Sequence, residues 1–307
     1  MASFGFLVIR GLFAVAEHVS PAATGRAAFQ LFSRVPHPGR VSDKERAALE
    51  KAEHIMREGR RHRLNLEGGG WITAYDFASP QGRRAPTVLV LHGWRSRAAH
   101  MSGIVDGLVH GGFRVIALDL PGHGESGGRY LNMANAVASV RAADQWFGPF
   151  SAIVGHSFGG AVAANAIVGS VTGIPPVAAG RLVTVSAPSS MPAIFREFGR
   201  FLNLGARAQT ALALRVLKIT GRPLEEFVVA RQLAEHPVPA LVVHAPDDKE
   251  VPASEAESMA KAGPHVRLHW APGLGHRRIL SDCDVTKRIV EFLTDPDIRA
   301  VRPAAAA

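Results

Sequence analysis

The sequence predicts an α/β fold: a mostly parallel eight-stranded sheet flanked by helices, with a helical cap insertion and an N-terminal helical extension. Three observations support this. Most predicted strands are short apolar runs without alternation, which is typical of strands buried on both faces of a parallel sheet. Helical segments separate most of these runs, as repeated β-α-β units require. With 47% hydrophobic residues among 307, the chain can build a large core.

Residues 1–61 are predicted to form the helical extension. The segment from Phe4 to Val19 is apolar, but Arg10 and Glu17 interrupt it. Its uninterrupted apolar runs are too short to span a bilayer, and Arg10 also breaks the pattern of a secretory signal. We interpret this segment as an amphipathic helix packed on the domain. Docking of residues 1–35 on a membrane surface is the alternative.

The predicted core comprises residues 62–186 and 237–297. It begins with a hairpin whose strands, Arg63–Glu67 and Trp71–Phe77, flank three consecutive glycines. Further strands are predicted at 87–92, 114–119, 152–155, 181–186, 240–245 and 266–271, and helices at 98–110, 133–148, 158–169, 253–262 and 283–294.

Residues 187–236 interrupt this alternation. They contain no strand signal, and apolar residues such as Ile194, Phe198 and Phe201 recur at helical spacing. A helical insertion in a parallel sheet predicts a cap over the carboxyl ends of the strands. Residues 298–307, which end in four alanines, are predicted to be a flexible tail.

The segment Gly155-His156-Ser157-Phe158-Gly159 has the form G-x-S-x-G and lies between a predicted strand and a predicted helix. A nucleophilic serine on a sharp strand-to-helix turn requires glycine neighbours, because a Cβ there would prevent close approach of strand and helix. The pattern alone is weak, and a structural glycine-rich turn is the competing interpretation. Its strand-turn-helix setting favours Ser157 as the nucleophile.

A serine hydroxyl needs a base, and the base needs a group that orients it. His276 follows the last predicted strand in a loop that can reach the nucleophile, whereas a solvated loop histidine is the alternative. Asp247 and Asp248 follow the preceding strand, so the order Ser, Asp, His is obtained with either acid. The spacing to the following Val-Pro pair favours Asp248, which leaves Asp247 as a turn residue.

Two backbone N–H groups must converge on the developing oxyanion. Phe158 directly follows the nucleophile, and Trp94 lies in the loop after the strand 87–92, so their N–H groups are the candidate donors. His92, Gly93 and His156 adjoin these residues, and we expect them to contact the substrate.

Charge and cysteine content narrow the class of protein. The net charge is +9, but the basic residues are scattered and lack interleaved aromatic residues, so we predict no nucleic-acid partner. The charge would still favour anionic substrates or an anionic lipid surface. The single cysteine, Cys283, excludes an intramolecular disulfide, which fits a cytoplasmic location, with membrane association as the alternative.

Together these segments resemble the α/β-hydrolase superfamily from about residue 62 to 295. The resemblance rests on His92-Gly93-Trp94, on Asp119 to Ser126, on Gly155 to Gly160, and on the pair Asp248 and His276. The first and third of these segments are similar to those of capped carboxylesterases. The resemblance implies an α/β-hydrolase fold and a Ser157-His276-Asp248 triad, with His123 structural and with no metal or organic cofactor.

The predicted function is therefore hydrolysis of a small-molecule carboxylic ester or thioester through an acyl-enzyme. The same triad could instead serve carbon–carbon bond hydrolysis, acyl transfer or membrane lipid hydrolysis, because the cap determines that choice. A non-catalytic binding protein on the same fold is the alternative of a different class. The oligomeric state is not predicted.

Overall fold

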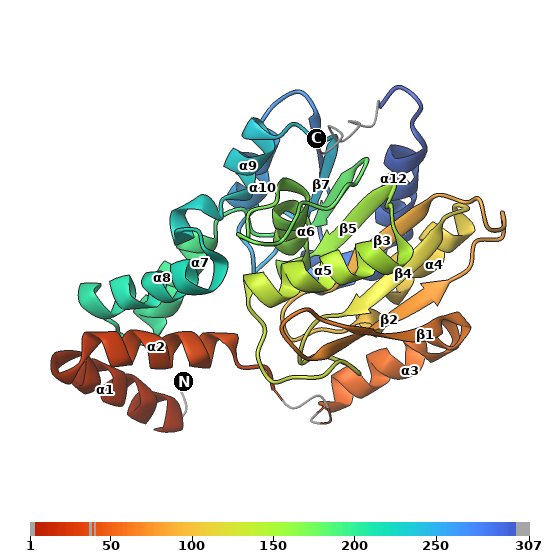
Figure 1. Ribbon diagram of the computed structural model, residues 1–307. Coiled ribbons are helices and arrows are strands. Elements are labelled where there is room, and N and C mark those ends of the chain that lie inside the picture. The colour runs from red at the N-terminus through yellow and green to blue at the C-terminus, as the bar shows by residue number, and fades with distance from the viewer. Residues whose placement is uncertain (1–3, 37–38, 40, 299–307) are drawn as a thin grey trace.

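The computed structural model describes residues 4–36, 39 and 41–298, and its centre is one sheet of eight strands (Figure 1). Their order is β1-β2-β4-β3-β5-β6-β7-β8. The first two strands form an antiparallel hairpin whose second strand pairs antiparallel with β4, and all other pairs are parallel. The bounds are β1 Arg60–Asn65, β2 Trp71–Phe77, β3 Thr87–Leu91, β4 Arg114–Asp119, β5 Ala152–His156, β6 Leu182–Val185, β7 Ala240–His244 and β8 Val266–Trp270.

The eight-stranded, mostly parallel α/β fold predicted from the sequence is confirmed. Strand β5 and strand β7 are buried over their whole length, as the unalternating apolar runs indicated. The hairpin differs in detail: β1 begins at Arg60, within the stretch predicted to be helical, and ends at Asn65 rather than Glu67. Its backbone pairing with β2 runs from Arg60 opposite Asp76 to Asn65 opposite Trp71.

Helices cover both faces of the sheet. Helices α5 (Met133–Phe147), α6 (Phe158–Val168) and α10 (Ala253–Ala260) contribute their buried side chains to one core cluster. Helices α4 (Ser102–His110) and α12 (Cys283–Thr294) contribute to the cluster on the other face. The predicted helix 98–110 is split, because a short 3-10 turn, η1 (Ala98–Met101), precedes α4.

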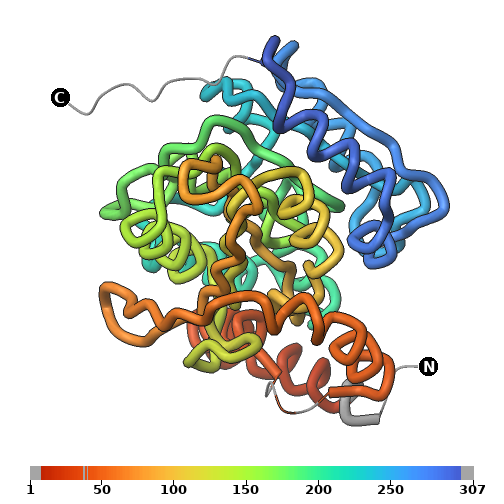
Figure 2. The backbone as a smooth tube through the Cα atoms, turned by 90° about the vertical axis from the view of Figure 1, so that its right-hand side faces the viewer, coloured from red at the N-terminus to blue at the C-terminus, as the bar shows by residue number. Residues whose placement is uncertain are grey.

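Two further groups of helices complete the fold. The N-terminal group is α1 (Phe4–Val19), α2 (Pro21–Ser33) and α3 (Asp43–Glu58), and in a view turned by 90° α1 and α2 lie at the opposite end from α12 (Figure 2). Between β6 and β7 the chain forms α7 (Met191–Phe201), α8 (Ala206–Thr220), the turn η2 (Leu224–Glu226) and α9 (Val229–Glu235). The short helices α11 (Gly275–Arg278) and η3 (Ile279–Ser281) precede α12.

The N-terminal helix α2 packs directly against α8. Gly25 permits this contact, since a Cβ there would lie 2.5 Å from Ala211 Cβ and 2.7 Å from Leu212 N. The end of α2 is joined to the core by backbone hydrogen bonds, from Val35 N to Arg129 O (2.9 Å) and from Leu131 N to Ser33 O (2.8 Å). Helix α2 is therefore held between α8 and the sheet domain.

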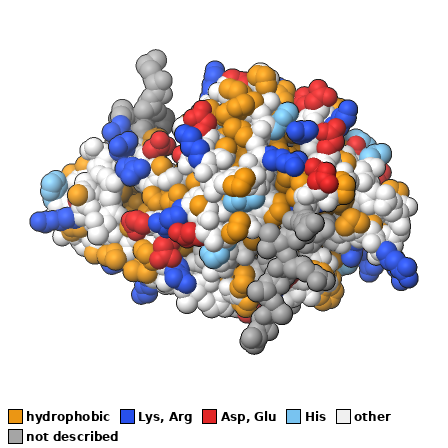
Figure 3. Space-filling model, turned by 90° about the horizontal axis from the view of Figure 1, so that it is seen from above, with side chains coloured by type: hydrophobic (Ala, Val, Ile, Leu, Met, Phe, Trp, Pro, Cys, Tyr) orange, Lys and Arg blue, Asp and Glu red, His pale blue; other side chains and the backbone are white. Residues whose placement is uncertain are grey.

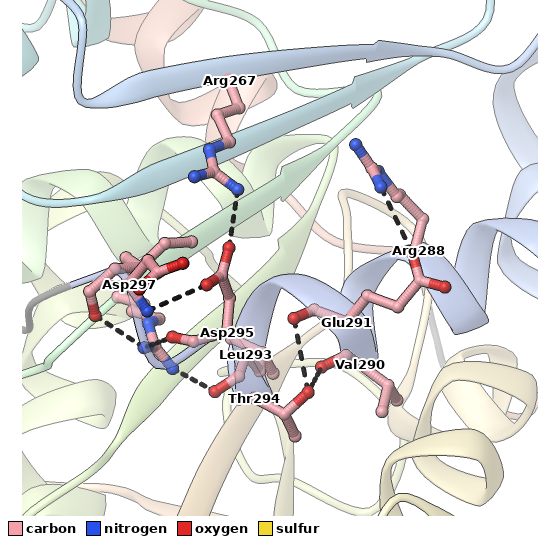
Figure 4. Close-up of polar contacts among 10 residues, drawn as sticks. Arg267, Arg288, Val290, Glu291, Leu293, Thr294, Asp295 and Asp297 are labelled. Atoms are coloured by element: carbon pink, nitrogen blue, oxygen red, sulfur yellow. Dashed lines mark hydrogen bonds and ion pairs between the residues drawn. The ribbon is translucent and has the colours of Figure 1, made fainter.

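The C-terminal end of α12 is fastened by arginines. Arg267 on β8 forms an ion pair with Asp295 at 2.9 Å (Figure 4). Arg181 donates hydrogen bonds to the carbonyl oxygens of Leu293, Asp295 and Ile298, the last at 2.7 Å. Ile298, predicted to start the flexible tail, is thus bound to the core. The rest of that tail, residues 299–307, lies outside the described residues.

Candidate active site

Ser157 stands at the turn between β5 and α6. Its φ of 51° and ψ of −126° are strained for a residue with a side chain. The strain is supported by neighbouring backbone: Ser157 N donates to Val185 O at 2.9 Å, and Gly160 N donates to Ser157 O at 2.9 Å. Ser157 is the residue before the first residue of α6, so its side chain lies at the positive end of that helix.

Glycines allow the chain to crowd around this turn. A Cβ on Gly159 would lie 2.5 Å from His92 O, and a Cβ on Gly160 would lie 2.6 Å from Ala187 Cβ. A Cβ on Gly93 would lie 2.8 Å from the Cβ of Ser157 itself. The loop after β3 therefore lies against the serine only because position 93 carries no side chain.

Asp248 lies in the loop after β7, and His276, which was predicted to lie in a loop, lies in the short helix α11 after β8. Asp248 Oδ2 lies 2.8 Å from His276 Nδ1, and the Asp248 side chain is fully buried. Its Oδ1 accepts hydrogen bonds from Glu250 N at 2.8 Å and Val251 N at 3.0 Å. Burial by itself would raise the pKa of the Asp248 carboxyl, but the hydrogen bonds from His276 and these two N–H groups outweigh it and lower that pKa well below its usual range.

The second nitrogen of His276 is directed to the open side of the site. His276 Nε2 lies 3.7 Å from Glu250 Oε2, on a side chain that is half exposed. Ser157, His276 and Glu250 all line one cavity. The neighbouring Asp247 is used differently, because its Oδ1 accepts a hydrogen bond from Gly273 N at 2.7 Å.

His156 lies beneath His276 and supports it. The two rings are 4.7 Å apart, and His156 Nε2 donates to the carbonyl oxygen of His276 at 2.8 Å. Burial, reinforced by the nearby His276 ring, lowers the pKa of His156 to about 3, so it is neutral at physiological pH. His156 thus holds the backbone of His276 through an uncharged contact.

Two further neutral histidines brace the loop after β3. His92 Nε2 accepts a hydrogen bond from Leu120 N at 2.9 Å, and its Nδ1 donates to Gly93 O at 2.7 Å. His123 Nε2 accepts from Arg95 N at 3.0 Å, next to Trp94. Burial lowers the pKa of both imidazoles, that of His123 to about 4. This arrangement agrees with the structural role expected of His123.

The sequence predicts that His92 and His156 contact the substrate, and the structure places both side chains behind the wall of the cavity. Both side chains are buried, at 0% and 4% exposure, and neither they nor Gly93 line the cavity that contains Ser157. Both ring nitrogens of His92, and Nε2 of His156, bind backbone groups instead. The three residues lie behind the reacting groups, and a direct contact of any of them with the substrate stays a prediction.

The cavity above Ser157 has a volume of about 720 Å³. The core contributes both candidate oxyanion donors, Trp94 and Phe158, whose rings meet edge to face at 5.7 Å. Pro188 and Val251 add to this lining, and the other apolar side chains come from α7 and the residue after it and, unexpectedly, from the N-terminal helices. These side chains are Ile9, Leu31, Phe32, Met191, Ile194, Phe198, Phe201 and Leu202.

Phe32 links the N-terminal extension to the site. Its ring stacks on Trp94 at 5.7 Å and packs against Phe195 at 4.5 Å and Phe198 at 5.1 Å. Sequence reasoning did not identify Phe32, Leu31 or Ile9 as site residues, because the ring contacts of Phe32 are with residues more than sixty positions away. The helical spacing of apolar residues in α2 indicates that one face of this helix is buried. It does not indicate which residues that face contacts.

Within the part of the chain that the structure describes, no group of three or more His, Cys, Asp or Glu side chains could hold a metal ion. Among the same residues, no helix is long and apolar enough to cross a bilayer.

Comparison with known proteins agrees with the geometry. A family model described as alpha/beta hydrolase family matches residues 88–288, more than half of the chain. This chain belongs to the alpha/beta hydrolase family. The expectation of a member of this family that is similar to esterases is thereby confirmed.

Among its relatives is the pimeloyl-[acyl-carrier protein] methyl ester esterase of Nitrosomonas europaea, 27% identical over 236 residues, which are 64% of this chain and 90% of the relative. An esterase of Pyrococcus furiosus has a TM-score of 0.56 at 22% identity, over 78% of this chain and 94% of that one. The esterase RhEst1 of Rhodococcus also has a TM-score of 0.56, at 18% identity, over 76% and 98%. At these identities the two solved structures show the shared fold.

Proposed function

We propose that this hydrolase cleaves a carboxylic ester through a covalent acyl-enzyme on Ser157. The observation that carries the proposal is the 2.8 Å contact between buried Asp248 and His276 Nδ1, in a site where His276 and a strained Ser157 line one cavity. A carboxylate on Nδ1 leaves Nε2 free of its proton and able to accept one. The remaining requirement is a nucleophile that reaches Nε2 when substrate is bound.

In the proposed reaction Ser157 Oγ attacks the ester carbonyl carbon and its proton passes to His276 Nε2. Asp248 stabilises the imidazolium that forms, and the N–H groups of Phe158 and Trp94 donate to the oxyanion. The tetrahedral intermediate collapses, and the alcohol leaves with the proton from Nε2. Water then attacks the acyl-enzyme, giving a proton to Nε2, and the acid departs as Ser157 regains its hydrogen.

The cavity supports an ester with an apolar acyl or alkyl group. Its lining is dominated by aromatic and aliphatic side chains, with the acidic residues Glu197 and Glu250 among few charged exceptions. Since burial of apolar surface drives binding, a longer hydrocarbon chain fills more of this space and binds more strongly. A thioester has the same acyl portion and fits the same cavity.

The test is an ester panel combined with an active-site probe. We expect Ser157→Ala to lower hydrolysis of p-nitrophenyl esters by at least about 10⁴-fold, because no other group supplies the nucleophile. A fluorophosphonate should label Ser157 in the unmodified protein. Ser281→Ala, which changes an exposed serine on η3, is the matched control and should behave as the unmodified protein.

Three outcomes would overturn the proposal. Full ester hydrolysis by the Ser157→Ala variant would remove Ser157 from the reaction. A folded protein that neither hydrolyses esters nor reacts with the fluorophosphonate would instead be a binding protein on this fold. If Ser157 is labelled but only non-ester substrates turn over, the triad serves a different reaction.

A further inference from the structure

Helix α1 presents an apolar stripe to solvent. Val8, Leu12, Val15 and Val19 are 45%, 65%, 66% and 82% exposed. Their spacing of four, three and four residues places all of them on one face of the helix. Within the described part of the chain, these are among the most exposed large hydrophobic side chains. Such a stripe on one helix is typical of a docking surface.

Basic residues outnumber acidic ones around this stripe, although the acidic residue Glu197 on α7 lines the cavity beside it. Segments 4–36 and 202–222, which include α1, α2 and α8, contain a single acidic residue, Glu17. Its carboxylate accepts a hydrogen bond from Gly205 N at the start of α8. The same segments contain Arg10, Arg26, Arg34, Arg207, Arg215, Lys218 and Arg222. Of these, Arg222 forms an ion pair with Glu226 at 3.6 Å. Elsewhere, as on the face in Figure 3, acidic and basic side chains are interspersed.

This apolar and basic surface reaches the entrance of the active-site cavity. Ile9 on α1, Leu31 on α2 and Phe201 on α7 line the cavity and are also 40%, 40% and 54% exposed. Ile9 directly follows Val8, the first exposed residue of the stripe. Side chains that are both in the cavity wall and open to solvent lie at its rim. The exposed stripe and part of the rim thus belong to the same helix α1.

We propose that α1, together with the rim residues Leu31 and Phe201, docks this protein on the surface of an anionic phospholipid bilayer. The apolar stripe would enter the interface while the basic residues of α2 and α8 contact the lipid phosphates, as in other amphipathic surface helices. Docking would bring the cavity entrance to the lipid layer, where an ester with an apolar chain is concentrated. The helix lies in the surface and does not cross it.

A second copy of this chain is the alternative occupant of the stripe. Self-association through this face would bring two basic surfaces together, and like charges across an interface oppose association. An anionic bilayer has the opposite charge. Charge complementarity therefore favours the membrane, and the two occupants are separable by experiment.

The experiment is co-sedimentation of the full chain with vesicles. We expect binding to vesicles of phosphatidylglycerol and phosphatidylcholine, much weaker binding to phosphatidylcholine alone, and weakening when salt is raised to about 0.5 M. The double variant Leu12→Glu/Val15→Glu should bind at least about 10-fold more weakly, because charge replaces the inserted apolar surface. Trp146→Glu on α5, where the side chain is likewise 66% exposed, is the matched control and should bind normally.

Far-UV circular dichroism and thermal unfolding of each variant report whether it is folded. If the double variant is unfolded, the charge-reversal variant Arg26→Glu/Lys218→Glu replaces it and should also weaken vesicle binding. Ser157→Ala should bind vesicles normally, because Ser157 takes no part in docking. Vesicle binding therefore tests docking independently of the proposed catalysis. Equal vesicle binding by the unmodified and double-variant proteins, or a dimer that the double variant dissociates without any vesicle binding, would overturn the proposal.

Discussion

Asp247 and Asp248 are chemically identical neighbours with different environments. Asp248 is buried and contacts His276, whereas Asp247 is exposed and accepts a hydrogen bond from Gly273 N. The sequence limited the candidates for the acid of the triad to these two residues. It favoured Asp248 because of its sequence spacing from Val251. Side-chain direction in a tight turn depends on backbone torsion angles, which residue identity alone does not specify. The structure places Asp248 on the histidine.

We expect the variants Asp248→Asn and Asp247→Asn to differ sharply in activity. The amide oxygen of an asparagine at position 248 can still accept from Glu250 N and Val251 N, so folding is preserved. The lost negative charge should lower kcat by about 10⁴-fold on the proposed mechanism. Asp247→Asn should change kcat by less than about 3-fold, because Asp247 is exposed and does not contact His276. Steady-state kinetics on one soluble ester checks both. Equal losses in the two variants would contradict the assignment.

Among the structural elements, the buried parallel strands were the most predictable. The predicted bounds of β4 coincide with those observed, and β5 and β7 differ by one residue at one end. Such strands are continuous apolar runs bounded by polar turns, so their signal is local. The position of α2 was not predictable in this way. Its contact with α8 joins residues that are nearly two hundred positions apart, and only packing in the folded state determines it.

Gly25 offers a test of the packing of α2. The variant Gly25→Leu would force α2 away from α8, which we expect to cost about 1–3 kcal/mol of folding stability. Because Phe32 moves with α2, the preference for longer acyl chains over acetate should fall by about 10-fold. Thermal unfolding and an ester panel graded by chain length measure the two effects.

The matched control is Gly11→Leu on α1, where a Cβ has open space around it. It should leave both the unfolding midpoint and the chain-length profile unchanged. If Gly25→Leu shows the same profile as the unmodified protein, α2 does not shape the acyl site, and the cavity specificity must come from the core and α7 alone.

At the scale of the whole molecule, the candidate site is assembled by the segments that follow β3, β5, β7 and β8. These strands all belong to the parallel part of the sheet, and none of these segments forms a site alone. The neutral histidines beneath the site also depend on the complete fold, because burial in the folded chain lowers their pKa values. Their titration therefore reports on the folded state as a whole.

Stability should consequently depend on pH below neutrality. The unfolded chain binds protons at these histidines near pH 6.5, while folded His123 and His156 bind them only near pH 4 and pH 3. The unfolded state thus holds more protons in this window, so the free energy of unfolding falls as pH drops from 6.5 towards 4. Each such histidine contributes a slope of up to about 1.4 kcal/mol per pH unit.

Urea unfolding at a series of pH values measures this slope. His123→Gln, whose amide oxygen can still accept the hydrogen bond from Arg95 N, should reduce the slope between pH 6.5 and 4. His236→Gln, which changes an exposed histidine at the end of α9, should leave it unchanged. An unfolding free energy that stays constant across this range would contradict the neutral state of the buried imidazoles.

The position of Leu31 and Phe32 in the cavity wall has an evolutionary consequence. The segment shared with the family runs from residue 88 to 288, so these two side chains lie outside it. Exchange of the leading helices by recombination could alter which esters are accepted while every reacting group is inherited unchanged. Similarity in residues 88–288 therefore indicates a shared reaction. The helices before this segment have to be compared separately before the substrate of one homologue is assigned to another.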